Sequence, residues 1–145
     1  MPASSMEEIA RRQARFGWHA LLAFLSLGLL LEALHGFKVA FYVDAMNETR
    51  RFLWTLAHAH GTLLALVNIA FGLSLRAFGA REGNESQLLL ASRCLMGATV
   101  LMPAGFFLGG ALPYGGDPGV GTILVPIGGF LLLGGVFFAA RSLRI

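Results

Sequence analysis

Four ionisable side chains that could carry chemistry lie between Leu31 and Gly61. They are one carboxylic acid and three of the chain's four histidines: Glu32, His35, His58 and His60. The segments on both sides are strongly apolar and are typical of membrane-spanning helices. Ionisable side chains are costly in such helices and usually have a function there. These four residues therefore form the candidate site.

Helical spacing indicates which of these side chains can work together. Glu32 and His35 are three residues apart, about 60° around a helix, so they face the same way. His58 and His60 are two residues apart, about 200° around a helix, so a regular helix cannot direct both into one site. We expect His58 to face the interior, because it shares a face with small residues. His60 is then expected to face another helix, a partner subunit or the membrane interface.

Three kinds of chemistry fit this set. Histidine is a common axial ligand of haem, so His35 and His58 could hold haem b between two facing helices. Glu32, His35 and His58 could instead supply an oxygen and two nitrogens to copper, zinc or iron, with His60 as an alternative ligand. The third interpretation involves no cofactor. In it Glu32 forms a hydrogen bond with a histidine, and the pair has a structural or proton-handling role.

Composition places the chain in the membrane class. Of its 145 residues 56% are hydrophobic and only 13% are charged, with a mean hydropathy of +0.69. A soluble domain has about 25% charged residues. The pI of about 9.8 reflects a net charge of only +3, which does not indicate a nucleic-acid partner. The single cysteine, Cys94, excludes an internal disulfide and a multi-cysteine zinc site.

The fold predicted from these patterns is an all-α integral membrane protein, an antiparallel four-helix bundle. A membrane-spanning helix needs about 20 apolar residues, so residues 1–145 form one domain with four spans. A short helix is expected to begin near Ser4 and continue into the first span, and a half-turn or short helix is expected in the first connection. The glycine- and proline-rich stretch 113–121 is expected to be a turn. The spans are approximately 16–37, 53–78, 88–112 and 121–140.

The distribution of arginine predicts the orientation. Seven arginines fall at the N-terminus, the second connection and the C-terminal tail, all on one side of a four-span protein: Arg11, Arg12, Arg15, Arg76, Arg81, Arg141 and Arg144. The positive-inside rule then predicts a multi-pass protein of the inner (plasma) membrane with both termini in the cytoplasm. The candidate site would lie near the external face.

Small residues predict which helix faces pack, since close approach matters when lipid supplies no hydrophobic drive. The second span carries a stripe of small residues together with His58 and Asn68, and the fourth has glycines every seven residues: Gly121, Gly128 and Gly135. Besides the four candidates, His19, Asn68 and Arg93 are predicted to be buried polar residues. Arg93 could instead extend to the headgroups. If buried, it would pair with Asn68 or with an anionic cofactor group.

The stretch from Glu32 to Gly72, which contains LAHAHGTLLALVNIAFG, resembles the first two helices of the haem–copper oxidase catalytic subunit and its nitric oxide reductase relatives. In that family a histidine early in the second helix is a ligand of the low-spin haem. The resemblance implies that role for His58 or for His60. It covers about a third of the chain, and the later helices that carry the family's other haem and copper ligands are absent.

The sequence thus predicts a small membrane protein that binds haem b, or else a metal ion, and that acts in electron transfer or in assembly of a respiratory complex. No nucleophilic catalytic arrangement is present, so we do not expect an enzyme in this chain alone. The competing prediction is a cofactor-free accessory subunit of a larger membrane complex or homo-oligomer. A weaker one is a proton-coupled transporter, which helices interrupted at Pro103 and Pro126 would favour.

Overall fold

The computed structural model describes residues 3–43 and 48–144, and these are almost entirely helical. Four long helices, each apolar and long enough to cross a bilayer, form the molecule. They are α1 (Ala3–Gly36), α3 (Glu48–Phe78), α4 (Glu85–Ala111) and α5 (Leu124–Ser142), with a short α2 (Ala40–Val43) and a 3₁₀ turn, η2 (Val120–Ile123). The predicted all-α, four-span, antiparallel fold is confirmed.

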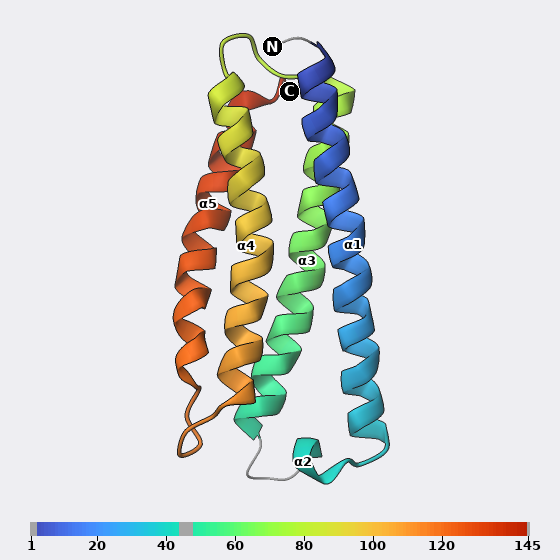
Figure 1. The fold of residues 1–145 in the computed structure, drawn as a ribbon, viewed down its shortest axis with the longest axis vertical. Coiled ribbons are helices and arrows are strands. Elements are labelled where there is room, and N and C mark those ends of the chain that lie inside the picture. The colour runs from blue at the N-terminus through green and yellow to red at the C-terminus, as the bar shows by residue number, and fades with distance from the viewer. Residues whose placement is uncertain (1–2, 44–47, 145) are drawn as a thin grey trace.

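The helices lie side by side in chain order (Figure 1). α1 packs on α3, α3 on α4, and α4 on α5, with a small contact between α1 and α4. Both termini and the α3–α4 connection lie at one end, the terminal end, and α2 lies at the other, the α2 end. Only 11% of the span in α1 is buried inside the chain, against 44% in α3 and in α4. The bundle is therefore an open row in which α1 forms one edge.

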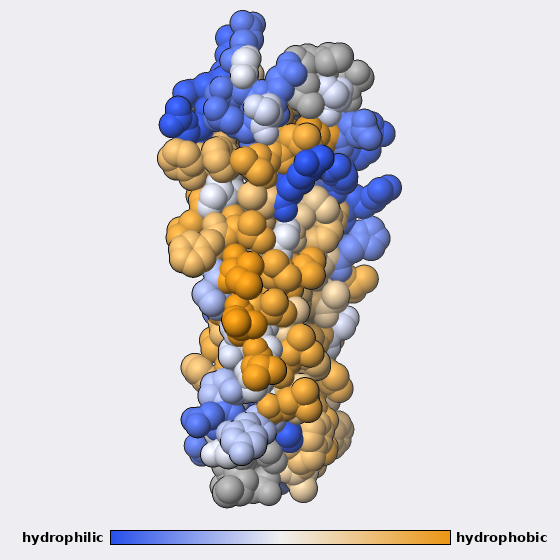
Figure 2. Space-filling view, turned by 60° about the vertical axis from the view of Figure 1, so that its left-hand side comes forward, coloured by the Kyte–Doolittle hydropathy of each residue, from blue (hydrophilic) through white to orange (hydrophobic). Residues whose placement is uncertain are grey.

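On the face shown in Figure 2, apolar residues cover most of the middle of the molecule, and hydrophilic residues gather toward the two ends. Large apolar side chains such as Leu29 and Phe130 are 73% and 76% exposed in the isolated chain. Such surface is stable only against lipid or another protein, so it supports the membrane assignment. Which end of the molecule faces the cytoplasm stays a prediction, based on the distribution of arginine.

Glycines set the distances between neighbouring helices. A Cβ on Gly128 would lie 2.8 Å from the backbone nitrogen of Met102 in α4, and one on Gly135 would lie 2.9 Å from Leu95. The glycine stripe predicted for the last span therefore packs on α4. The stripe on α3 is likewise buried, and Gly72 packs against the backbone of Ala10 in α1. Both stripes act by allowing close approach.

Within the described residues, the segments that connect the long helices have the structures predicted from the sequence. α1 is continuous from the polar N-terminal segment, as predicted, and α2 provides the short helix of the first connection; residues 44–47 lie outside the described residues. In the loop after α4, Tyr114 and Asp117 exchange backbone hydrogen bonds across Gly115 and Gly116, whose φ angles are +59° and +92°. Glycine adopts that left-handed conformation without strain, so the predicted turn is confirmed.

Pro103 and Pro126 do not interrupt the helices that contain them. Pro103 lies buried within an unbroken α4. Pro126 is the third residue of α5, in the first turn, where a missing backbone N–H is tolerated. The interrupted helices that would have favoured a transporter are therefore not found in these two elements.

Candidate functional site

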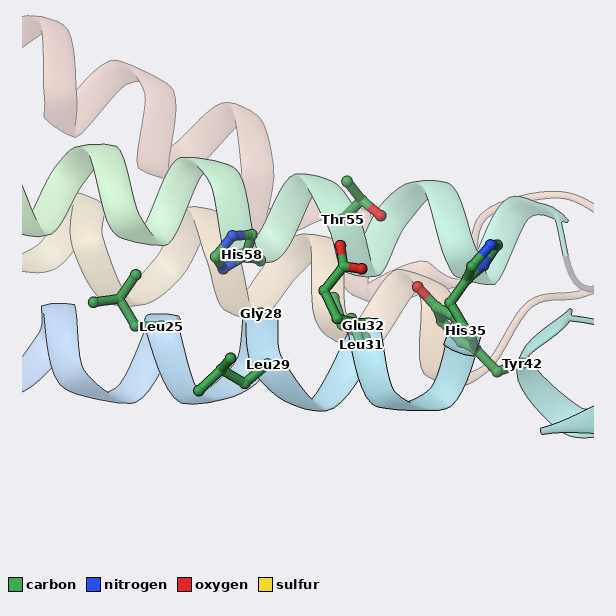
Figure 3. A pocket seen from close by; sticks show the side chains of 9 residues that line it. All are labelled: Leu25, Gly28, Leu29, Leu31, Glu32, His35, Tyr42, Thr55 and His58. Atoms are coloured by element: carbon green, nitrogen blue, oxygen red, sulfur yellow. The ribbon is translucent and has the colours of Figure 1, made fainter. Parts of the chain in front are cut away.

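A cavity of about 660 Å³ opens between α1 and α3 near the α2 end (Figure 3). Its apolar wall comes from Leu25, Gly28, Leu29 and Leu31, all on α1. Its polar lining comes from three helices: Glu32, His35, Tyr42, Thr55 and His58. The volume lies within the range of about 300–1,000 Å³ typical of small-molecule sites. The structure thus brings three of the four predicted site residues to one cavity, which we call the α1–α3 cavity.

His58 is fixed by its fit against α1. A Cβ on Gly28 would lie only 2.7 Å from Nδ1 and 2.9 Å from Nε2 of the His58 ring, so only glycine leaves room for the imidazole. Nδ1 is 2.8 Å from the carbonyl oxygen of Phe24, which can only accept, so Nδ1 carries the proton and donates. A histidine held in this way has its tautomer fixed and its other nitrogen, Nε2, as an acceptor. Within residues 3–43 and 48–144, Nε2 has no hydrogen-bond partner.

Glu32 and His35 are less constrained. Both are exposed in the isolated chain, and their side chains make no hydrogen bond or ion pair with the described residues. The carboxylate of Glu32 points from α1 across the cavity toward α3 and Thr55 (Figure 3). Both groups are therefore available to a ligand.

The two cavity histidines occupy its two ends. His58 packs on Gly28, and His35 lies seven residues further along α1, a rise of about 10 Å. Glu32 lies between them along the helix (Figure 3). Among the described residues no three histidine, cysteine, aspartate or glutamate side chains come together as the ligands of one metal ion. The predicted three-ligand copper, zinc or iron site is therefore not assembled in this structure.

Aromatic and arginine side chains hold the cavity's end wall in place. Tyr42 of α2 is 4% exposed and stacks on Trp54 of α3, with ring centroids 6.1 Å apart. Arg50 donates to the carbonyl oxygen of Phe41 at 2.9 Å, and Arg51 donates to that of Tyr42 at 3.3 Å. α2 is thus fastened to the start of α3. In the sequence, only the aromatic and basic composition of the connection between α1 and α3 indicates this wall.

The other histidines lie away from the α1–α3 cavity. His60 faces α4, where its ring packs on Phe106 with centroids 4.9 Å apart, as expected for a residue opposite His58. His19 and Arg93 are exposed, so the prediction that they are buried is wrong for the isolated chain. The ring of His19 stays on its own helix, where Nδ1 bonds the carbonyl oxygen of Arg15 at 2.7 Å. Arg93 adopts the alternative position, on the surface.

Asn68 is buried as predicted, but its partners are neutral. Its side chain accepts from Gln13 of α1 at 2.5 Å and donates to Thr99 of α4 at 2.7 Å. Ser92 of α4 completes the network by donating to Gln13 at 2.7 Å. All four side chains are at most 1% exposed. The sequence did not identify Gln13, because this residue lies in a polar segment typical of the surface, and it did not identify Thr99 as the partner of Asn68 on α4.

No protein-family model, curated protein or solved structure matches this chain. The likeness of its first two helices to the haem–copper oxidase family therefore rests on the quoted residues alone.

Proposed function

We propose that this small integral membrane protein binds haem b in the α1–α3 cavity, where His35 and His58 would hold it. One observation carries the proposal: two imidazoles, each with an unpaired nitrogen among the described residues, lie at the two ends of a single cavity. Haem is commonly held in helical bundles by histidines on facing helices.

The lining of the α1–α3 cavity fits a large flat group: the wall of leucines offers apolar contact, and the volume of about 660 Å³ is ligand-sized. Two histidines that hold haem bind the same iron, so the side chains of His35 and His58 would have to approach each other as they would for a single ion. The rise of about 10 Å along α1 between Gly28, which packs on His58, and His35 therefore does not distinguish the two cases. A three-ligand metal site would in addition need Glu32 beside both imidazoles, and no such group of three is assembled among the described residues.

Each residue of the cavity has a distinct role in this proposal. The carbonyl oxygen of Phe24 orients His58 and fixes its tautomer. Glu32, which has no partner among the described residues, would accept hydrogen bonds or a proton beside the cofactor. Haem would supply one-electron transfer, so the chain would act in electron transfer within the membrane or in delivering haem to a respiratory complex. By the positive-inside rule, the arginine distribution would put this cavity near the external face.

The test is an absorption spectrum of protein purified in mild detergent from cells supplied with haem. The wild-type protein should show a Soret band, which His35→Ala and His58→Ala should each weaken and shift, because each variant leaves one ligand. His19→Ala is the matched control, because it removes an exposed imidazole from the middle of α1, outside the α1–α3 cavity, and should keep the band.

The alternatives give different results. A colourless protein that carries no metal and co-purifies with a membrane complex would contradict the proposal and favour the accessory subunit. A colourless protein with stoichiometric copper, zinc or iron would show instead that the cavity rearranges around an ion.

A further inference from the structure

A second concavity lies on a different side of α1 from the haem site proposed above. It is an apolar groove of about 470 Å³ between α1 and α4, with Ala57 of α3 at its floor. Its sides include Phe16, Ala20 and Leu27 of α1 and Val100, Ala104 and Phe107 of α4. We call it the α1–α4 groove. Both helices are apolar and long enough to cross a bilayer, so lipid would have access to the groove.

Arginines lie where this groove reaches the terminal end. On α1, Arg12 lies four residues before Phe16 and eight before Ala20, so it continues the line of groove residues. Its side chain crosses to α4, where it donates to the hydroxyl of Ser92 at 3.2 Å. Arg12 therefore lies across the terminal end of the groove.

More positive charge surrounds the same position. Arg11, Arg12 and Arg15, together with Glu8, line a separate cavity of about 490 Å³ at the terminal end. On α4, the exposed Arg93 lies seven residues before Val100 and eleven before Ala104, on the face that lines the groove. The arginines from both helices thus outnumber the one acid and give this end of the groove a net positive charge.

We propose that the α1–α4 groove is a binding site for an anionic phospholipid, with one acyl chain in the groove and the phosphate among Arg12, Arg15 and Arg93. Guanidinium groups bind phosphate through paired hydrogen bonds. Basic pockets between membrane helices on the cytoplasmic side are known to bind anionic headgroups. Charge complementarity selects this occupant: an uncharged apolar molecule would not require the arginines, and a soluble phosphate would not require the groove.

The test compares lipids added to the purified full-length protein, using thermal unfolding and native mass spectrometry. Phosphatidylglycerol should bind and raise the unfolding temperature more than phosphatidylcholine does. The double variant Arg15→Gln/Arg93→Gln should lower the affinity by about fivefold for each arginine removed. This variant keeps Arg12 and its bond to Ser92, so folding is preserved.

Two controls make the result specific. Arg81→Gln/Arg144→Gln removes the same charge from exposed positions at the same end but outside the groove, and should keep lipid binding. Ala104→Phe fills the groove without changing charge, and should weaken lipid binding.

Three results would overturn the proposal. The first is equal binding of the two lipids, and the second is an equal loss of affinity in the two double variants, which would indicate general surface attraction only. The third is an equal effect of glycerol phosphate, which has the headgroup charge but no acyl chain. None of these readouts depends on haem, so this proposal can fail separately from the proposed function.

Discussion

The imidazole of His58 occupies the space that a side chain at Gly28 would need. Three ring atoms, Cε1, Nδ1 and Nε2, lie within 3 Å of the position of a Gly28 Cβ, and Nδ1 donates to the carbonyl oxygen of Phe24 one turn earlier on α1. This fit joins α1 to α3 at the inner end of the α1–α3 cavity. It also determines which nitrogen of His58 remains for a ligand.

Gly28→Ala should therefore destabilise the chain by about 1–3 kcal/mol, the usual range for overpacking a tight interface. Gly134→Ala is the control, because that glycine is also helical and a Cβ there would meet nothing within 4 Å. It should leave stability unchanged or raise it slightly, since alanine favours helix. Unfolding in mixed detergent micelles measures both.

The contact can be isolated with a second substitution. In Gly28→Ala/His58→Ala the overlap with the ring is gone, so the double variant should lose clearly less stability than the sum of the two single variants. Additive losses would show that Gly28 and His58 do not interact as described.

The buried hydrogen bonds of Asn68 with Gln13 and Thr99 are expected to stabilise the terminal half of the molecule. Asn68→Leu removes the partner of both Gln13 and Thr99, so their buried polar groups lose hydrogen bonds. The expected cost is about 1–3 kcal/mol. Ser26→Ala should cost little, because that exposed hydroxyl bonds only a carbonyl of its own helix. If Asn68→Leu unfolds at the same denaturant concentration as the wild type, the network contributes nothing to stability.

Two adjacent glycines test the packing of α5 on α4. A Cβ on Gly128 would lie 2.8 Å from backbone nitrogen of Met102, which cannot easily move, whereas one on Gly129 would lie 3.6 Å from the flexible end of the Met102 side chain. Gly128→Ala should lower the unfolding temperature, and Gly129→Ala should leave it almost unchanged. Equal effects would mean that α5 packs through a different face.

Much of this architecture could be predicted from the sequence. Apolar runs of about 20 residues identify membrane helices because the bilayer fixes their length. The opposite directions of His58 and His60 follow from helical periodicity alone. The glycines of α5 recur every seven residues, so they lie on one face, and the structure places that face against α4.

Other features depend on which helices meet, and helical periodicity does not determine that. Gln13 is buried because α1 packs on α3 along its polar N-terminal segment as well as along its apolar span. The composition of that segment is typical of an exposed surface. Pairing with Asn68 was one alternative for a buried Arg93, but Arg93 is exposed and Thr99 of the same helix bonds Asn68 instead. The positions of His35 and His58 along the α1–α3 cavity depend on the register of α1 against α3, which brings Gly28 against the His58 ring.

The most direct test of the central claim is the optical and electron paramagnetic resonance spectrum of the purified, haem-loaded protein. Two histidine ligands predict a low-spin haem in the wild type. His35→Ala and His58→Ala should each leave one ligand and give a high-spin spectrum, whereas His60→Ala should stay low-spin because His60 faces α4. A protein that takes up no haem, or whose haem spectrum is unchanged in both His35→Ala and His58→Ala, would contradict the account.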